Sequence, residues 1–287
     1  MKHDVLFGNI TDQIVEAIKT GEITRWQSPY TNRGLAKNHF TGHVYSGINF
    51  ILFNFFNKDS VKLYGTFVQI SEAGGKIKRG AKAKSAVFAS PVFKFEGKNI
   101  DAKTAAQLKK EGKKVESFFF YKEYKVFSLA DVEGINYETE TLQPEGNKNE
   151  DLDMFIQKTG AEIIHIDQTV GCYYPAIDKI NMPNPENMLD NTYYPTIFHE
   201  LGHWTGAKNR LNREGIVQKI EKGTPKYAFE ELVAELTSAF LCAIYGIECI
   251  DQSAAYIDFW LDFLEQDKTF IVKAAAAAQK AVDYLTK

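Results

Sequence analysis

Two histidines flank a glutamate in the run His199-Glu200-Leu201-Gly202-His203. Residues four apart on an α-helix lie almost above one another, so both imidazoles can reach one metal ion. Glu200 lies one step round the helix, where it can take a proton from a water molecule held by the metal. Zinc lowers the pKa of that water towards neutrality, which makes hydrolysis of a peptide bond feasible near pH 7. The spacing therefore predicts a catalytic metal site with His199 and His203 as ligands and Glu200 as general base.

The residues around this motif predict the helix that it needs. Thr192 is a suitable N-cap, Pro195 falls in the first turn, and Gly206 follows as a terminator. Gly202, between the two histidines, lowers helix stability and is expected where another backbone comes close. The packed flank of the helix is formed by apolar side chains: Ile197, Phe198, Leu201 and Trp204.

A catalytic zinc site needs a third protein ligand. The longer pattern H-E-x-x-H-x-x-G-x-x-H would need a histidine where the chain has Asn209. A second helix is predicted over residues 227–242, which resembles the glutamate-zincin arrangement, in which a downstream helix supplies a glutamate ligand. We expect Glu231 as this ligand and Glu235, one turn later, as hydrogen-bond partner of a ligand histidine. Glu230 is the alternative ligand, because spacing alone does not exclude a shift by one residue. His165, in the alternating run 161–167, is expected in a strand.

Length and charge indicate two domains. A chain of 287 residues can build two cores. Up to residue 140 there are 21 Lys and Arg against 15 Asp and Glu, a net charge of +6; the remainder has 13 against 22, a net charge of −9. A basic N-terminal half suggests contact with a polyanion. We place the domains at 1–137 and 152–287, joined by a polar linker, 138–151, that lacks apolar periodicity.

Location follows from what the sequence lacks. The first residues resemble no signal peptide, and no stretch of about 18 apolar residues predicts a membrane span. Three cysteines, Cys172, Cys242 and Cys249, form no even disulfide set and no C-x-x-C pair. We expect a cytoplasmic protein without a membrane partner, and do not expect Cys172 to be a zinc ligand.

The N-terminal half combines cations with aromatic strands. Helices are predicted at 6–18, 47–56 and 66–73, strands at 85–95 and 117–129, and a charged insertion at 96–116 that projects as a hairpin arm or helix. The segment before the first strand holds five cations in nine residues: Lys76, Lys78, Arg79, Lys82 and Lys84. Cations beside rings are typical of proteins that bind single strands without sequence preference. The same composition is compatible with a solvated loop and a phenylalanine core.

Over nearly its whole length the chain resembles the ArdC-type antirestriction proteins of plasmids and other mobile elements. In the N-terminal half the likeness rests on short motifs in order: Ile10-Thr-Asp12, Trp26, Lys37-Asn38, Thr41-Gly42, Tyr45-Ser-Gly-Ile-Asn49, Thr66-Phe-Val-Gln69 and Gly74-Gly-Lys-Ile-Lys-Arg-Gly80. In the C-terminal half it rests on the histidine block with its Trp204-Thr-Gly206 tail, on Asp178-Lys-Ile-Asn-Met-Pro183 and on Glu230-Glu-Leu-Val-Ala-Glu-Leu236. The stretch Arg25–Pro29 and the charged insertion depart from the family pattern.

The resemblance implies an α+β fold of two domains: a small mixed α/β domain that binds single-stranded DNA, then a mainly helical zincin-like metallopeptidase domain with a small sheet. It implies protection of incoming mobile-element DNA from host restriction and a Zn²⁺ site, which other divalent transition metals could also occupy. We expect the five cations above to contact DNA and the peptidase to have a protein substrate, which the sequence does not name. Asp178–Pro183 is expected as an edge strand that aligns a peptide, and Tyr173, Tyr174 and Tyr227 are candidates to stabilise an oxyanion.

Two other functions remain open. One is a DNA-shielding protein whose zinc domain is structural. The other is a regulatory metalloprotease that cleaves a repressor or another protein partner and binds no DNA. Mimicry of DNA needs a densely acidic surface, and the net charge of −3 with a basic N-terminal half argues against it.

Overall fold

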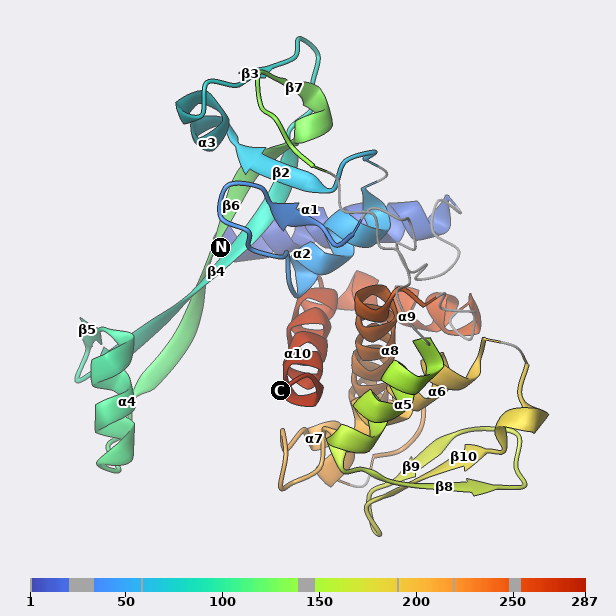
Figure 1. The fold of residues 1–287 in the computed structure, drawn as a ribbon. Helices are drawn as coiled ribbons and strands as arrows, with labels where there is room; N and C mark the ends of the chain where they lie inside the picture. The colour runs from blue at the N-terminus through green and yellow to red at the C-terminus, as the bar shows by residue number, and fades with distance from the viewer. Residues whose placement is uncertain are drawn as a thin grey trace.

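The computed structural model describes residues 2–20, 34–57, 59–138, 148–189, 191–218, 220–247 and 254–287. Within these residues the chain forms a sheet-based N-terminal part and a mainly helical C-terminal part (Figure 1). Trp26, Cys249 and most of the predicted linker, residues 139–147, lie outside the described residues.

The N-terminal part is built on a five-stranded sheet with strand order β1-β2-β6-β4-β5. Its strands are β1 (Lys37–Asn38), β2 (Leu63–Thr66), β4 (Lys84–Phe95), β5 (Lys98–Ile100) and β6 (Glu116–Ser128). A second sheet pairs β3 (Lys76–Ile77) with β7 (Val132–Glu133). The helices are α1 (Lys2–Lys19), α2 (Ile48–Phe50), α3 (Phe67–Glu72) and α4 (Ala102–Lys110), with the π-helix η1 (Ile51–Phe56) and the 3₁₀-helix η2 (Leu129–Asp131).

Most of the predicted N-terminal elements are confirmed. The apolar stripe of helix α1 is buried through Ile10 and Ile14. Helix α3 begins with a capping box, in which Thr66 and Gln69 satisfy each other's backbone N–H groups. The predicted helix at 47–56 differs: after one α-helical turn it continues as the π-helix η1. The charged insertion contains both predicted alternatives, because β5 and α4 together form the end of a projecting arm (Figure 1).

The C-terminal part has a three-stranded sheet and six helices among the described residues. The strands β8 (Glu162–Ile166), β9 (Cys172–Tyr174) and β10 (Lys179–Pro183) have the order β8-β10-β9. The helices are α5 (Lys148–Thr159), α6 (Tyr193–Trp204), α7 (Glu214–Val217), α8 (Pro225–Tyr245), α9 (Ala254–Gln266) and α10 (Phe270–Leu285), with the turn η3 (Pro185–Asn187). Helix α5 starts inside the predicted linker, whose last four residues are therefore helical.

The prediction that Asp178–Pro183 is an edge strand is wrong. Strand β10 lies in the centre of its sheet, parallel to β8 and antiparallel to β9. Its inward side chains, Ile180 and Met182, are fully buried. The tight turn between β9 and β10 lets β9 pair with the side of β10 that does not face β8. The sequence of β10 gives no sign of this second pairing. The edge strand next to the motif helix α6 is therefore β9.

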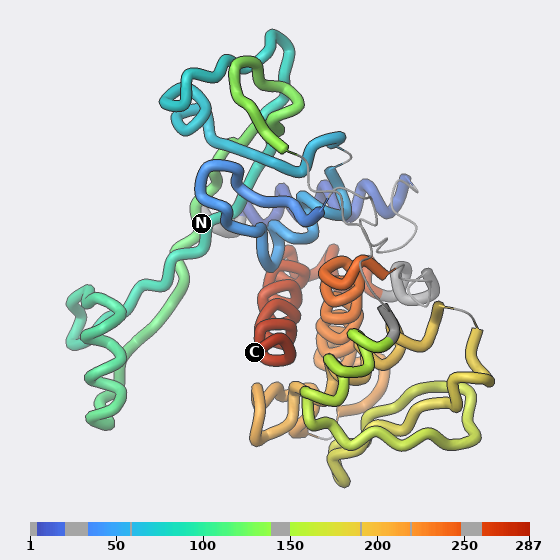
Figure 2. Tube along the Cα trace, viewed as in Figure 1, coloured from blue at the N-terminus to red at the C-terminus, as the bar shows by residue number. Residues whose placement is uncertain are grey.

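One hydrophobic core joins the two parts. Helix α10 packs against α8 through alanines, and Ala274, Ala275 and Ala278 have no exposed surface. Figure 2 shows that α10, at the end of the chain, returns to α2 of the N-terminal part. The ring of Phe50 in α2 packs at a tilt against Phe240 of α8, with 4.3 Å between centroids. No helix among the described residues is long and apolar enough to cross a membrane.

Candidate metal centre

The motif helix α6 packs against α8 with unusually close backbones. A Cβ atom on Gly202 would lie 3.0 Å from the Cα atom of Ala234, so only glycine allows this contact without movement. The predicted close approach at Gly202 is thereby confirmed. Thr192 precedes the helix as predicted, but its side chain makes no capping hydrogen bond to it. The close packing brings side chains of α8 above the two histidines of α6.

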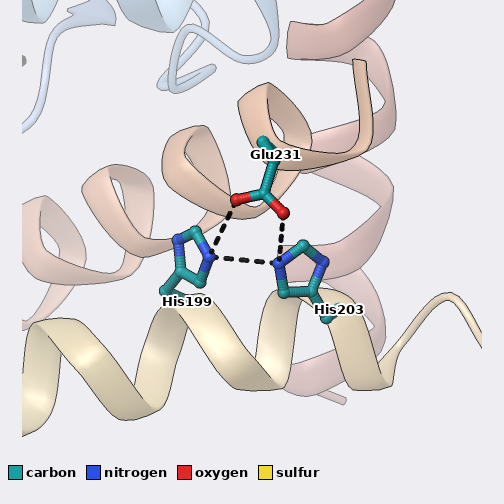
Figure 3. Close-up of side chains that lie close together, drawn as sticks. All are labelled: His199, His203 and Glu231. Atoms are coloured by element: carbon teal, nitrogen blue, oxygen red, sulfur yellow. Dashed lines mark hydrogen bonds and ion pairs between the residues drawn. The ribbon is translucent and has the colours of Figure 1, made fainter. Parts of the chain in front are cut away.

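His199, His203 and Glu231 converge at the interface between α6 and α8 (Figure 3). The two Nε2 atoms lie 3.1 Å apart. The Glu231 carboxylate lies 3.7 Å from Nε2 of His199 and 3.6 Å from Nε2 of His203. All three side chains are largely shielded, with exposed fractions of 18%, 12% and 14%. The described residues thus present two imidazole nitrogens and one carboxylate around a single point.

This donor set fits a divalent metal ion. An ion bonded to tetrahedral ligand atoms at about 2.1 Å separates those atoms by about 3.4 Å. The two Nε2 atoms are 3.1 Å apart, and each lies 3.6 or 3.7 Å from a different oxygen of the Glu231 carboxylate, so the separations are close to that value. Two imidazoles with one carboxylate also form a set that zinc and other first-row transition metals accept.

A carboxylate lies close to Nδ1 of each histidine, on the side of the ring away from the converging Nε2 atoms. Nδ1 of His199 lies 3.5 Å from Glu235, as predicted for a supporting partner. Nδ1 of His203 lies 3.3 Å from Glu230. Glu230 was the alternative ligand, but it faces the far side of the ring and not the point where the Nε2 atoms meet. Since each Nδ1 faces a carboxylate, each Nε2 lone pair is directed into the site.

Arg213, which the sequence did not single out, completes the support of His203. Its guanidinium donates hydrogen bonds to Glu230 at 2.6 and 3.0 Å. It also donates to the Gly202 carbonyl oxygen at 2.6 Å and to Oγ1 of Thr205 at 2.8 Å. These contacts tie the end of helix α6 to helix α8. No local pattern marks Arg213, because its partners lie 8 to 17 residues away.

Glu200 lies next to the three converging side chains and is 7% exposed. Its Oε2 atom accepts a hydrogen bond from the backbone N–H of Tyr173 in β9, at 2.6 Å. Burial raises the pKa of Glu200 above the usual value for a carboxyl group. A carboxylate with a raised pKa accepts a proton more readily at neutral pH.

Charges within the site are unevenly distributed. Burial and the neighbouring His203 hold the pKa of His199 well below its usual range. Burial also lowers the pKa of His203, but the hydrogen bond with Glu230 and the charges of Glu200 and Glu231 outweigh it. Burial and the charge of Glu231 raise the pKa of Glu235 to about 7. The pair of imidazoles therefore sits in a strongly negative surrounding, which favours a cation at their centre.

The other predicted candidates lie apart from this point. Nε2 of His165 lies 3.0 Å from the Tyr193 hydroxyl, and His165 belongs to β8 as expected. Cys172, in β9, is half-buried and does not belong to the converging group. The hydroxyl of Tyr173 donates to Asp178 at 2.8 Å and accepts from Arg210 at 3.1 Å. Tyr173 is therefore engaged in a structural cluster.

The predicted cations of residues 76–84 lie in a different part of the molecule. Lys76, Lys78, Arg79 and Lys82 are exposed. Lys78 donates to the Ala130 carbonyl oxygen at 2.8 Å, and Lys84 forms an ion pair with Asp59 at 3.0 Å. Lys76, Arg79 and Lys82 extend towards solvent.

Comparison with known proteins identifies the family. Residues 6–127 match the N-terminal domain of anti-restriction factor ArdC, and residues 150–277 match the zincin-like metallopeptidase family. The metal-free crystal structure of the antirestriction ArdC protein from plasmid R388 is 30% identical, with a TM-score of 0.76 over 98% of this chain and 96% of that one. The chain belongs to the ArdC antirestriction family. A second crystal structure of the R388 ArdC protein, bound to Mn(II), superposes with a TM-score of 0.74 at 30% identity and covers 98% of this chain and 97% of that one.

Two curated relatives extend the family likeness. An uncharacterized protein of Sinorhizobium fredii, y4eC, is 28% identical over 98% of this chain and 91% of its own length. DNA primase TraC of Escherichia coli is 29% identical over 96% of this chain, which spans only 19% of that protein. The ArdC-like unit therefore also occurs as a minor part of a much longer protein.

Proposed function

We propose that this chain is an antirestriction protein that binds single-stranded DNA through its basic N-terminal half and carries a metal-dependent peptidase centre. The observation that supports the peptidase part is the convergence of His199, His203 and Glu231 beside the buried Glu200. Membership of the ArdC family supports the antirestriction part.

His199, His203 and Glu231 would hold the ion, with Glu235 and Glu230 orienting the two rings. We expect Zn²⁺, and the Mn(II) bound by the R388 protein supports a site that accepts other divalent ions. When bound, such an ion acts as a Lewis acid on the scissile carbonyl and makes water more acidic.

Glu200 would be the general base. The Tyr173 N–H group fixes one oxygen of the carboxylate, which leaves the orientation of the second oxygen defined. Glu200 would take a proton from the attacking water and pass it to the leaving amine. An extended peptide would lie along β9, the sheet edge beside Glu200. Among the three candidate tyrosines, Tyr174 is exposed on β9, and the neighbouring Cys172 is the main cause of the raised pKa of its phenol, with a smaller contribution from Glu200.

DNA contact would involve the cations Lys76, Lys78, Arg79, Lys82 and Lys84. Their positive charge would neutralise phosphates and release counterions, so affinity should fall as salt rises. Protection would follow from covering single-stranded DNA as it enters a restricting cell.

Two variants test the peptidase part. Glu200→Gln keeps the size of the side chain and its hydrogen bond with Tyr173, so it should retain bound metal but protect transferred plasmid DNA at least about tenfold less well. His203→Ala should lose both metal, measured by elemental mass spectrometry, and protection. Wild-type protection by Glu200→Gln would show that the centre is structural and overturn the peptidase role.

A titration with a labelled single-stranded oligonucleotide at two salt concentrations tests the DNA part. We expect binding that weakens with salt. A wild-type protein that binds no oligonucleotide would favour the alternative, a regulatory metalloprotease with a protein substrate.

A further inference from the structure

Strands β4 and β6 form a long two-stranded ribbon that leaves the body of the protein (Figure 1). Their pairing is continuous from Lys84 opposite Val126 to Lys94 opposite Glu116. An isolated ribbon of this kind is marginally stable in water and is usually covered or charged. Here α4 and β5 close its far end, while its near end joins the five-stranded sheet through β2.

The two faces of the ribbon differ. Side chains alternate along a strand, and directly opposed residues share a face. The register therefore groups four rings on one face, which we call the aromatic face: Phe88, Phe118, Phe120 and Tyr124. Their exposed fractions are 54%, 46%, 50% and 38%. Large apolar groups gathered at this exposure on a monomer usually mark a binding surface.

The opposite face is the one that packs on the body. Tyr121 contacts Phe7 of α1 edge-on, with 4.7 Å between ring centroids. Helix α2 holds the ribbon at the free edge of β4, where the side-chain amide of Asn49 exchanges two hydrogen bonds with the backbone of Val87, at 2.6 and 2.7 Å. Beyond the buried Ala86 and Val126 at the near end of the ribbon, the aromatic face consequently points away from α1.

Lysines accompany the rings on the aromatic face. Nζ of Lys122 lies 4.9 Å from the ring centroid of Tyr124, and Nζ of Lys94 lies 5.3 Å from that of Phe118. In the paired region of the ribbon, the register places one acidic side chain on the aromatic face, Glu116, which lies opposite Lys94. Residues 84–128 together carry ten lysines and five acidic residues, a net charge of +5. A partner of this face should therefore contain planar aromatic groups, which stack on the exposed rings, and negative charge, which pairs with the lysines.

The spacing of the rings fits a nucleic-acid strand. Side chains two residues apart on one strand, such as Phe118 and Phe120, are separated by about 6.8 Å. This distance is twice the base step of about 3.4 Å, so a ring can occupy one stacking position between two bases. Bases in a duplex already stack on one another, which leaves only unpaired bases available to such rings.

We propose that the aromatic face is the platform on which single-stranded DNA stacks its bases, with Lys94 and Lys122 contacting the phosphates. This inference rests on the proposed function and assigns DNA binding to a surface beyond the cations of residues 76–84. That segment runs directly into β4, so a strand bound on the ribbon can continue to it.

Three neighbouring phenylalanines give a matched test in the full-length protein. Phe118, Phe119 and Phe120 follow one another on β6 and are similarly exposed, but Phe119 lies on the opposite face. The probe is a fluorescein-labelled oligothymidylate of 20 nucleotides, and binding is measured by anisotropy. Phe118→Ala and Phe120→Ala should each raise Kd about tenfold without changing the salt slope, and Phe119→Ala should stay within about twofold.

A spectroscopic variant reports stacking directly. Phe118→Trp should keep wild-type affinity, and its indole fluorescence should be quenched when the oligothymidylate binds. Lys122→Gln should reduce the salt slope by about 0.7, the value for one phosphate on a single strand. Circular dichroism of every variant establishes that it is folded.

Three results would overturn the inference. Wild-type affinity in Phe118→Ala and Phe120→Ala, with loss of binding on neutralising Lys76, Arg79 and Lys82, would place the DNA on that segment alone. A dimer by light scattering that dissociates in the Phe variants would assign the aromatic face to a second copy of the chain. A wild-type protein without affinity for the oligonucleotide would remove the proposed DNA function itself, a result distinct from the first two.

Discussion

The metal centre and the β4–β6 ribbon place opposite kinds of side chain in opposite surroundings. At the metal centre, charged and polar groups are buried: Glu200 and Glu230 are 7% and 3% exposed. On the ribbon, apolar rings are exposed, and Phe88 and Phe120 retain 54% and 50% of their surface. Neither arrangement favours the stability of the folded chain by itself. Each is easier to explain by a partner, a cation in the first case and a flat anionic ligand in the second.

The two regions also differ in how they are supported. Each imidazole of the metal centre faces a carboxylate, and Glu230 in turn is held by Arg213. The ribbon makes few contacts beyond its own ladder and its two ends. We therefore expect substitutions at the centre to change stability and metal affinity, and those on the aromatic face to change ligand binding only.

A large effect on stability is expected from Gly202. Gly202→Val adds three carbons where the first already lies 3.0 Å from the backbone of Ala234, so α6 and α8 must separate. We expect a loss of about 3 kcal/mol in the free energy of unfolding, measured in urea. Gly202→Ala should lose less, because the gain in helix propensity of about 1 kcal/mol offsets part of the strain. An unchanged valine variant would mean that the helices do not need this close contact.

Glu230→Gln is expected to have the next largest effect. The charge of Glu230 holds His203 and Arg213, and those two partners keep its pKa below the usual range despite burial. Removing such a supporting group lowers metal affinity by about 10- to 100-fold. Competition with a chelator measures this change, and Glu235→Gln at the other histidine is the matched comparison. Affinity equal to that of the wild type would leave Glu230 with a purely structural role.

Asp178→Asn should have a smaller effect that depends on pH. Arg210 is 5% exposed and donates to Asp178 at 3.0 Å, and this contact holds the pKa of Asp178 below its ordinary value. A lowered pKa stabilises the fold above the unfolded value of about 3.9, and this stabilisation is lost as pH falls through the folded value. Because Asp178 is 46% exposed, we expect only about 1 kcal/mol at pH 7.

Urea unfolding at several pH values measures that difference. The wild type and Asp178→Asn should approach each other in stability as the solution becomes more acidic than about pH 4. Lys125→Gln, which breaks the more exposed pair with Glu123, is the control and should change stability little. A gap that stays constant down to acidic pH would exclude the ionised carboxylate as its source.

Local spacing accounts for the part of the centre that the sequence predicted. The histidines and Glu200 share one helical turn, and the helix over 225–245 lies where apolar periodicity placed it. The structure brings Glu231 to the two histidines, although their role as ligands stays a prediction. The roles of Glu230 and Arg213 could not be predicted, because adjacent residues on a helix point about 100° apart and only the packing of α6 decides which side each faces.

Pairing between distant segments explains what the sequence missed in the fold. The strand Lys179–Pro183 reads the same whether it lies at an edge or in the centre, and only the turn before it places β9 on its open side. The alternation of Phe118 to Tyr124 is compatible with a core strand. These side chains are exposed because β4 and β6 project away from the body, and the insertion at 96–116 closes their far end.

The smallest change in stability is expected on the aromatic face itself. Phe118→Ala removes a ring that is 46% exposed, whereas Phe198→Ala in α6 removes one that is fully buried. We expect the first to change the free energy of unfolding by at most about 0.5 kcal/mol and the second to lower it by about 3–5 kcal/mol. Urea titration of both variants gives the two values under the same conditions. A loss above about 1 kcal/mol in Phe118→Ala would mean that the ring packs against the folded chain, and the exposed rings would then need no ligand to explain them.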